Sequence, residues 1–347
     1  DYDPREYDAI VATGEQVTIG LLAIALQGLG IKARSWMGWQ VPIHTDAVHG
    51  KARIERIETD ELDARMNNGE VPVVAGFQGI GPDNRITTLG RGGSDTSAVA
   101  LAAALNADRC DIYTDVDGVY TTDPRIVAKA QKLDKITYEE MLEMASLGAK
   151  VLQTRSVQLA MKEGVRLQVL SSYTDEPGTL VVDEDEIVEQ AVVSGIAYSR
   201  DEAKISLMGV SDKPGVAARI FGPLTNANVN VDMIVQNVSE DGSTTDLTFT
   251  VAQADLRKAV DTLEKDQDGI EYRQLISDAD VVKVSVIGVG MRSHAGVAQT
   301  MFSALAERGI NIQVISTSEI KVSVLIAEEY TELALRALHT AYDLDAE

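Results

Sequence analysis

In the first half of the chain, Ala- and Leu-rich stretches with helical spacing alternate with short runs of β-branched residues. Helices are expected at residues 17–29, 94–106 and 138–145, and strands at 71–77, 111–114 and 167–170. Alternation of this kind predicts an α/β domain with a largely parallel sheet.

The second half of the chain contains an internal repeat. The stretch Lys-Ile-Ser-Leu-Met-Gly-Val at 204–210 matches Lys-Val-Ser-Val-Ile-Gly-Val at 283–289, and Asn-Val-Asn-Val at 228–231 corresponds to Gly-Ile-Asn-Ile at 309–312. The distance from Gly215 to Asn230 equals that from Gly296 to Asn311, 15 residues in both copies. Equal spacing at matching positions indicates duplication.

Each copy has the order of a ferredoxin-like βαββαβ module. In the first copy, the elements are expected at 204–210, 216–227, 229–237, 245–251, 256–263 and 270–276. The second copy ends on a helix at 331–342 and lacks a closing strand. We expect the apolar run 191–197 to supply that strand, which would insert the first module within the second; the alternative is a simple linker strand.

An acidic run at 183–186, after Glu-Pro-Gly-Thr at 176–179, marks the boundary between the two halves. We therefore expect a first domain at 1–183, a first repeat module at 203–278, and a second module formed by 191–199 together with 281–347.

The charge balance and the few cysteines and histidines exclude several classes of protein. With 31 Lys+Arg against 54 Asp+Glu, the net charge of −23 disfavours a nucleic-acid partner. We see neither an uninterrupted apolar run of about 20 residues nor a secretion signal, which disfavours a membrane partner. The sequence has a single cysteine, Cys110, and four scattered histidines, His44, His49, His294 and His339. They form no Cys/His metal framework, so we assign no metal ligands, and the single cysteine fits a cytoplasmic protein.

The segment 87–96, Thr-Thr-Leu-Gly-Arg-Gly-Gly-Ser-Asp-Thr, runs directly into an Ala-rich helix. Glycines allow a ligand close to the backbone, and free amides at a helix N-terminus attract anions, so Arg91 beside this turn suits a carboxylate or phosphate. An equally weighted reading is a flexible turn in which Ser94 or Asp95 merely caps the helix.

Two further clusters carry weaker signals. Acidic and hydroxyl residues at 113–125 follow an expected strand, where open parallel sheets bind ligands, although an acidic turn is the commoner explanation. Glu15, in Thr-Gly-Glu at the start of a helix, would by itself be read as compensating the helix dipole.

Together these strings resemble the aspartokinases over nearly the whole chain. The resemblance rests on Gly-Glu before a helix, TTLGRGGSDT at 87–96, YTDVDGVYTTDPR at 113–125, EMLEMASLGAKVL at 140–152, MRSHAGVA at 291–298 and ISTSEIKVSVL at 315–325. It implies the amino-acid kinase fold, a three-layer sandwich with a largely parallel sheet, followed by two ACT domains that sense amino acids. It also implies ATP- and Mg²⁺-dependent phosphorylation of the β-carboxylate of L-aspartate to 4-phospho-L-aspartate, the first step of lysine, threonine and methionine biosynthesis.

The resemblance further implies residue roles. Arg91 would bind the aspartate α-carboxylate, Glu15 would lie at its amino group, and Asp95 would orient a catalytic lysine. Gly92, Gly93 and Ser94 would complete the substrate loop, and Lys150 would act at the phosphates. The remaining nucleotide contacts would come from Thr114, Asp115, Tyr120, Thr121, Asp123, Arg125 and Val151.

In one respect the sequence departs from the family. Aspartokinases begin with a strand followed by Lys-Phe-Gly-Gly-Thr-Ser, whose lysine and amides grip the transferred phosphoryl group, and this sequence has no such string. We expect that segment to precede Asp1 in the complete protein. The alternative is a non-catalytic, amino-acid-sensing regulatory protein, whereas the tandem repeats disfavour a kinase for glutamate or acetylglutamate.

In the repeats, loops after the first strand lead into helices whose N-terminal amides could receive an amino-acid carboxylate. By resemblance these sites would bind the feedback inhibitors lysine and threonine; the alternative for any single residue is helix capping or contact between modules. The candidate residues are Asp212, Pro214, Gly215, Val216, Ala217, Asn230, Gln236 and Asn237 in the first copy, and His294, Ala295, Val297, Asn311, Ile312, Thr317, Ser318 and Glu319 in the second. Exposed sheet edges predict a homodimer through the ACT domains, or a heterotetramer with a regulatory chain.

Overall fold

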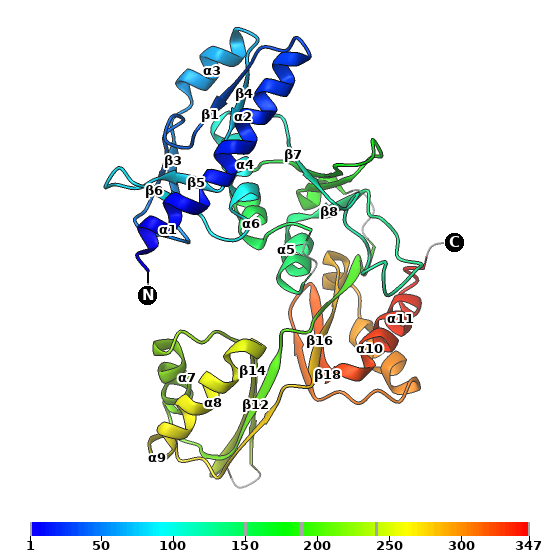
Figure 1. Cartoon of the computed structure of the whole chain (residues 1–347). Coiled ribbons are helices and arrows are strands. Elements are labelled where there is room, and N and C mark those ends of the chain that lie inside the picture. The colour runs from blue at the N-terminus through cyan, green and yellow to red at the C-terminus, as the bar shows by residue number, and fades with distance from the viewer. Residues whose placement is uncertain (1, 149–150, 188–190, 240–241, 346–347) are drawn as a thin grey trace. The chain divides into compact units, whose positions relative to one another are not determined.

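The computed structural model of the chain describes residues 2–148, 151–187, 191–239 and 242–345. It divides into two compact units (Figure 1). Unit 1 comprises Asp1–Val119, Leu133–Ala145 and Lys150–Val188, and unit 2 comprises Tyr120–Lys132, Ser146–Ala149 and Glu189–Glu347.

Unit 1 is built from helices and short strands in alternation. Its helices are α1 (Pro4–Val11), α2 (Thr13–Gly28), α3 (Asp60–Asn67), α4 (Gly93–Ala104), α5 (Tyr138–Ser146) and α6 (Thr154–Glu163). Its strands are β1 (Ala33–Trp36), β2 (Ile43–Thr45), β3 (Ile54–Ile57), β4 (Val71–Val74), β5 (Gln78–Ile80), β6 (Ile86–Thr88), β7 (Cys110–Thr114), β8 (Lys135–Thr137), β9 (Leu167–Ser171) and β10 (Thr179–Val182).

The sheets of unit 1 mix parallel and antiparallel neighbours. Strands pair in parallel between β1 and β4, β2 and β5, β7 and β9, and β8 and β10. Antiparallel pairs join β2 to β3, β5 to β6 and β9 to β10. The α/β class read from the alternation is therefore confirmed, with parallel strands set in mixed sheets.

Helices α1 and α2 form one nearly continuous run because Ala12 between them keeps a helical backbone. Asp3 caps α1 by accepting a hydrogen bond from the Arg5 amide at 2.9 Å, and proline occupies the first turn. The run Pro4–Gly28 is, by length and composition alone, long and apolar enough to cross a membrane, and 17% of its apolar window is buried. One such helix is weak evidence, because core helices and N-terminal signal sequences pass the same test. It is not an uninterrupted apolar run, because Glu15 and Gln16 lie within it. Ile19 and Ala23 pack in a core cluster.

Unit 2 contains two four-stranded antiparallel sheets with helices (Figure 1). The first sheet has the order β13-β14-β12-β15 and the second the order β11-β16-β18-β17. The strands are β11 (Gly195–Ser199), β12 (Ala203–Ser211), β13 (Val231–Val238), β14 (Thr244–Val251), β15 (Gln274–Asp278), β16 (Val281–Ile287), β17 (Val314–Thr317) and β18 (Lys321–Ala327). The helices are α7 (Val216–Asn226), α8 (Leu256–Lys265), α9 (Gln267–Ile270), α10 (Val297–Glu307) and α11 (Thr331–Ala341).

Strand β11, which precedes the first repeat, pairs antiparallel with β16 of the second repeat. The strand expected at 191–197 therefore exists, but its expected start is wrong, because β11 begins only at Gly195. A side chain at Gly290 would place its Cβ 2.5 Å from the carbonyl oxygen of Ala191, so this part of the chain lies against a glycine backbone instead of joining the ladder. The ladder starts at Gly195, opposite Ile287.

Two further strand boundaries expected from the sequence are wrong. The strand expected at 71–77 ends at Val74, and Phe77 has a left-handed φ of 65° that a strand does not allow. The strand expected at 270–276 begins only at Gln274, because Gln267–Ile270 is the short helix α9 and Glu271 follows it with a φ of 57°.

The segment 120–132 belongs to unit 2, although our expected first domain includes it. Thr121 accepts a hydrogen bond from the Ile196 amide at 2.7 Å through its carbonyl oxygen, and Val127 lies in the same hydrophobic cluster as Val284 and Leu335. This loop is therefore packed onto the second repeat module.

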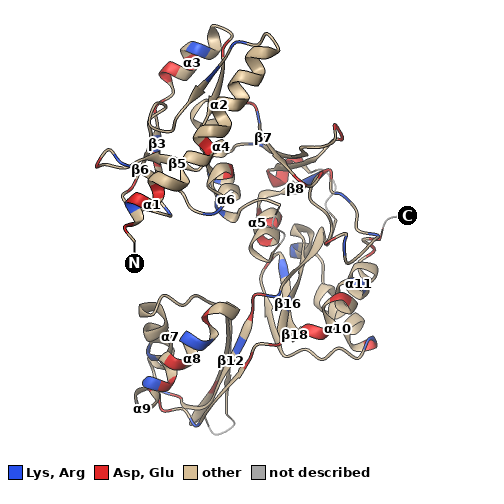
Figure 2. Cartoon of the chain, viewed as in Figure 1, with Lys and Arg blue, Asp and Glu red and all other residues tan. Residues whose placement is uncertain are grey.

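Contacts between the two repeat modules in unit 2 reflect the duplication. Lys204 and Lys283 occupy matching repeat positions and are the only basic residues of β12 and β16, visible as one blue segment on each strand (Figure 2). Lys204 donates to Gln313, and Lys283 donates to Asp232 and, at 2.7 Å, pairs with the buried Glu202. Burial lowers the pKa of Lys283, but these two carboxylates outweigh it and raise the pKa overall.

Candidate functional site

The glycine-rich segment connects β6 to α4 in unit 1. Gly92 precedes the helix with a φ of 70°, and a Cβ there would lie 2.0 Å from Cγ of Gln153. A Cβ on Gly93 would lie 2.8 Å from the Phe77 ring and 2.9 Å from Cβ of Leu89. Both positions therefore require glycine, the first for its backbone conformation and its space, the second for its space.

Three of the expected substrate residues gather at the N-terminus of α4. The hydroxyl of Ser94 donates to the Glu15 carboxylate at a long 3.5 Å, and Arg91, exposed, stands in the same turn. Glu15 is half-buried in the first turn of α2. A basic residue in the preceding turn, the first amides of α4 and a carboxylate from α2 thus occur at one helix N-terminus, a combination that suits a ligand with both a negative and a positive group.

Asp95 lies in the first turn of α4, next to this site. Burial raises the pKa of its carboxyl group, and a hydrogen bond from the backbone of Gln153 opposes that rise. Lys150, expected at the phosphates, lies outside the described residues. Val151 is partly buried in unit 1, just before the fully buried Leu152.

The residues expected to bind the nucleotide are divided between the two units. Thr114 and Asp115 lie at the C-terminal end of β7 in unit 1, where the Thr114 hydroxyl donates to Asp115 at 3.1 Å. Four more of these candidates, Tyr120, Thr121, Asp123 and Arg125, belong to unit 2.

The four candidates in unit 2 already have partners there or face solvent. Thr121 is buried, and its hydroxyl lies 2.9 Å from Nε2 of His339. Arg125 is 87% exposed and pairs with Asp123 at 2.8 Å. That pairing holds the pKa of Asp123 below its usual value and raises the pKa of Arg125.

Arg155 on α6 supports the glycine-rich segment, although no motif in the sequence points to it. It donates to the carbonyl oxygen of Leu89 at 2.9 Å and to that of Ala52 at 2.7 Å, so it holds the segment just before Arg91 from the side of α6. Burial lowers its pKa. An arginine on a helix usually faces solvent, and only the fold brings it to these carbonyl groups.

In unit 2 the two repeats present matching helix N-termini. Helix α7 follows Gly215 and α10 follows Gly296, with φ of 90° and 99° and no side-chain cap on either helix. In the loop before α7, the Asp212 amide donates to the carbonyl oxygen of Ser243 at 3.1 Å. In the loop before α10, Nδ1 of His294 lies 2.9 Å from the carbonyl oxygen of Gly290.

The other effector candidates divide by burial. Val216 and Val297 are buried in the cores of their modules, so their side chains serve packing. Ile312 is partly buried. The exposed candidates are Pro214, Ala217, Asn230, Gln236, Asn237, Ala295, Asn311, Thr317, Ser318 and Glu319. Among the residues that the structure describes, no group of three or more His, Cys, Asp or Glu side chains is placed to hold a metal ion.

Comparison with known families gives two matches. Residues 2–171 match the amino acid kinase family, and residues 205–267 and 284–342 match the ACT domain. An aspartate kinase of Stutzerimonas stutzeri is 61% identical over 344 residues, covering 99% of this chain and 83% of the relative. An aspartokinase of Corynebacterium glutamicum is 49% identical over 348 residues, covering 99% of this chain and 82% of the relative.

Solved structures agree with these matches. E. coli aspartokinase III in complex with aspartate and ADP, described as the R-state, has a TM-score of 0.81 at 28% identity, covering 98% of this chain and 76% of that one. The same enzyme with lysine and aspartate, described as the T-state, has a TM-score of 0.77 at 29% identity, covering 97% of this chain and 76% of that one. The chain therefore belongs to the amino acid kinase family, as an aspartate kinase with paired ACT domains.

Proposed function

We propose that this aspartate kinase binds L-aspartate at the N-terminus of α4 and there transfers the γ-phosphoryl group of ATP to its β-carboxylate. A carboxylate oxygen forms the new bond to phosphorus, the bond to the bridging oxygen of ADP breaks, and 4-phospho-L-aspartate leaves. This is the first step toward lysine, threonine and methionine.

The observation that carries the proposal is the meeting of Glu15 and Ser94 at 3.5 Å beside Arg91. Aspartate bears an ammonium group between two carboxylates. Arg91, with the amides of α4, complements the α-carboxylate, and Glu15 complements the ammonium group. Gly92 and Gly93 allow the turn before α4 to pack closely against Gln153, Phe77 and Leu89, which fixes the position of the helix N-terminus.

We further propose that Asp95 orients the catalytic lysine and that Lys150 and Val151 lie along the nucleotide. Thr114, Asp115, Tyr120, Thr121, Asp123 and Arg125 are the remaining candidates for nucleotide contacts. Phosphoryl transfer depends mainly on positioning and charge neutralisation, so basic and hydroxyl groups suit this role.

Mg²⁺ is the expected companion of the nucleotide. Kinases usually hold it with one or two carboxylates and the substrate phosphates, and not with a protein cage. The described residues fit this way of holding the ion: Asp115 offers an exposed carboxylate, and no three His, Cys, Asp or Glu side chains among them are grouped to form a metal cage. When bound, the ion would neutralise phosphate charge during transfer.

For regulation, we propose that lysine, threonine or both bind at the ACT domains and reduce turnover. The support is that the loops before α7 and α10 expose uncapped helix amides next to polar strand residues. Coupling free energies between two sites are typically about 1–3 kcal/mol, enough for a 5- to 150-fold effect. We also propose a cytoplasmic homodimer through the ACT domains, with a catalytic domain at 1–183 and ACT domains at 203–278 and at 191–199 plus 281–347.

The test is a hydroxylamine trap on the full-length protein. With ATP, Mg²⁺ and aspartate, the trapped acyl phosphate should accumulate as aspartyl hydroxamate, and lysine or threonine should lower its rate. Glutamate in place of aspartate is the matched control and should give little product. Binding of lysine or threonine without any hydroxamate would instead favour a non-catalytic sensor.

A further inference from the structure

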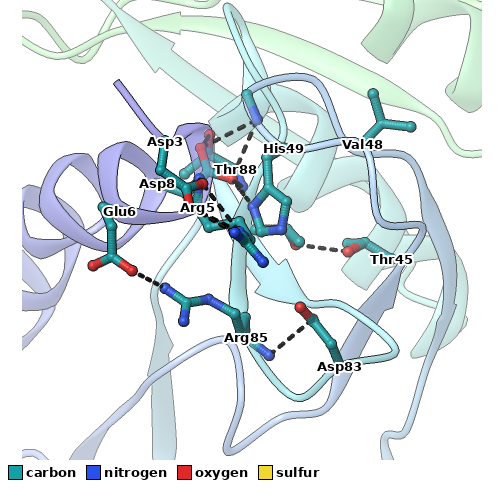
Figure 3. Close-up of polar contacts among 12 residues, drawn as sticks. Asp3, Arg5, Glu6, Asp8, Thr45, Val48, His49, Asp83, Arg85 and Thr88 are labelled. Carbon is teal, nitrogen blue, oxygen red and sulfur yellow. Dashed lines mark hydrogen bonds and ion pairs between the residues drawn. The ribbon is translucent and has the colours of Figure 1, made fainter. Parts of the chain in front are cut away.

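The carboxylate of Asp8 is fully buried in unit 1, outside the residues assigned to the site. It lies on α1 and receives hydrogen bonds from two other segments (Figure 3). The Thr88 hydroxyl donates at 2.6 Å and the Thr88 amide at 3.1 Å, the Gly50 amide donates at 3.1 Å, and Nδ1 of His49 lies at 2.7 Å. A buried carboxylate with this many donors is held firmly in one position.

The partners of Asp8 link it to the substrate segment. Thr88 ends β6 and is followed by the turn that carries Arg91. Because α1 and α2 form one helical run, Asp8 and Glu15, seven residues apart, fall on nearly the same helix face. The same helical run therefore contacts the 88–94 segment at two levels, Asp8 with Thr88 and Glu15 with Ser94.

These two contacts differ in strength. Asp8 makes short bonds away from water, whereas the Glu15–Ser94 bond is 3.5 Å long and borders an exposed residue. Between them, Gln78 donates to the carbonyl oxygen of Ala12 at 3.1 Å. The helix is thus fixed at the level of Asp8, while Glu15 keeps its bonding capacity for a ligand.

We propose that Asp8 is a positioning residue for aspartate recognition: it fixes the register of the α1–α2 run against β6, so that Glu15 faces Ser94 and Arg91. The inference rests on the proposed aspartate site. Asp8 does not touch the substrate, and it acts through Thr88 and the helix.

The test uses steady-state kinetics of the full-length enzyme. Asp8→Asn keeps the size but turns an N–H toward the donors of Thr88 and Gly50, so the KM for aspartate should rise about tenfold or more while the KM for ATP stays within about twofold. Thr88→Val, which loses only the hydroxyl donor, should raise the aspartate KM by a smaller factor. Thr88→Ser, which keeps the donor, should behave like the wild type.

A matched control is Glu140→Gln. Glu140 is also buried in unit 1 and also accepts from the amide and hydroxyl of one threonine, Thr137, at 3.1 and 3.0 Å. This variant should lower the melting temperature and leave the ratio of the two KM values unchanged. A rise in the KM for aspartate without a matching rise in the KM for ATP, seen for Asp8→Asn and Thr88→Val but not for Glu140→Gln, supports the positioning role of Asp8.

Two results overturn the inference. One is an aspartate KM unchanged in both Asp8→Asn and Thr88→Val; the other is an equal rise of both KM values. If Asp8→Asn does not fold, the Thr88→Val and Thr88→Ser pair decides alone. A wild-type enzyme without aspartate-dependent turnover would overturn the proposed function as well, whereas a normal wild type with unchanged variants would overturn only the role of Asp8.

Discussion

Helix α4 of unit 1 and helices α7 and α10 of unit 2 begin in the same way in different surroundings. Each follows a left-handed glycine, with φ of 70° at Gly92, 90° at Gly215 and 99° at Gly296, and none has a side-chain cap. At Gly92 a Cβ would collide with Gln153, while at Gly215 and Gly296 no heavy atom lies within 4 Å of the Cβ position.

This difference in packing indicates two different uses of the same kind of helix start. All three termini offer amides to an anion. Around Gly92 the packing allows one conformation, which suits a catalytic site where small displacements of the substrate are costly. The open termini in unit 2 suit reversible binding of a regulator, in which the protein exchanges between liganded and free states.

The largest expected effect comes from Gly92→Ala. The added methyl group meets Gln153 and imposes a left-handed conformation on alanine, which together should cost about 2–5 kcal/mol of unfolding free energy. Displacing the neighbouring Arg91 should also lower kcat/KM for aspartate about 100-fold or more. Urea unfolding and initial rates measure the two effects. A variant with wild-type rates would show that the packing around Gly92 does not matter.

Next is Arg91→Ala, which should affect activity alone. Arg91 is exposed, so unfolding should be unchanged, while loss of a charged ligand contact should lower kcat/KM for aspartate about 100-fold, or about 2.7 kcal/mol. Arg91→Lys should recover only part of it, because lysine cannot form the bidentate contact. Arg109→Ala, which removes a partly exposed arginine paired with Asp111, is the control and should leave kinetics unchanged.

Gly215→Ala and Gly296→Ala should have smaller effects. With open space at both positions, only the left-handed backbone is strained, for about 1–2 kcal/mol each. Uninhibited turnover should stay near that of the wild type, and inhibition by lysine or threonine should weaken. If either variant loses as much stability as Gly92→Ala, the contrast between packed and open termini is wrong.

The smallest effect is expected for Asp212→Ala. The backbone amide of Asp212, bonded to Ser243, survives the substitution, so the loop should keep its conformation. Loss of the carboxylate near an effector's ammonium group should raise the half-inhibitory concentration about fivefold. Unchanged inhibition curves for lysine and for threonine would remove Asp212 from the effector site.

Repetition and alternation along the sequence predicted the fold well. The equal spacing of the repeats identified two modules, and β11 does pair with β16 of the second one. Boundaries failed where backbone geometry decided them, as at Glu271, whose left-handed φ ends α9 in a run that reads as a strand. Such a conformation at a glutamate gives no signal in composition.

The site was predicted only as far as its residues are neighbours in the sequence. Gly92, Gly93, Ser94 and Arg91 stand in one string, and resemblance added Glu15. Asp8 and Arg155 escaped notice because each looks like an ordinary solvent-facing helix residue until the fold brings distant donors or carbonyl groups to it. Asp8 is 80 residues from its partner Thr88, and Arg155 is 66 residues from its partner Leu89.

The most direct test of the aspartate site is a crystal structure of the full-length enzyme with aspartate and a non-hydrolysable ATP analogue. We expect the α-carboxylate to lie against the guanidinium group of Arg91 and the amides of α4, with the ammonium group at Glu15. Aspartate bound elsewhere, with Glu15 still bonded to Ser94 and Arg91 in solvent, would contradict it.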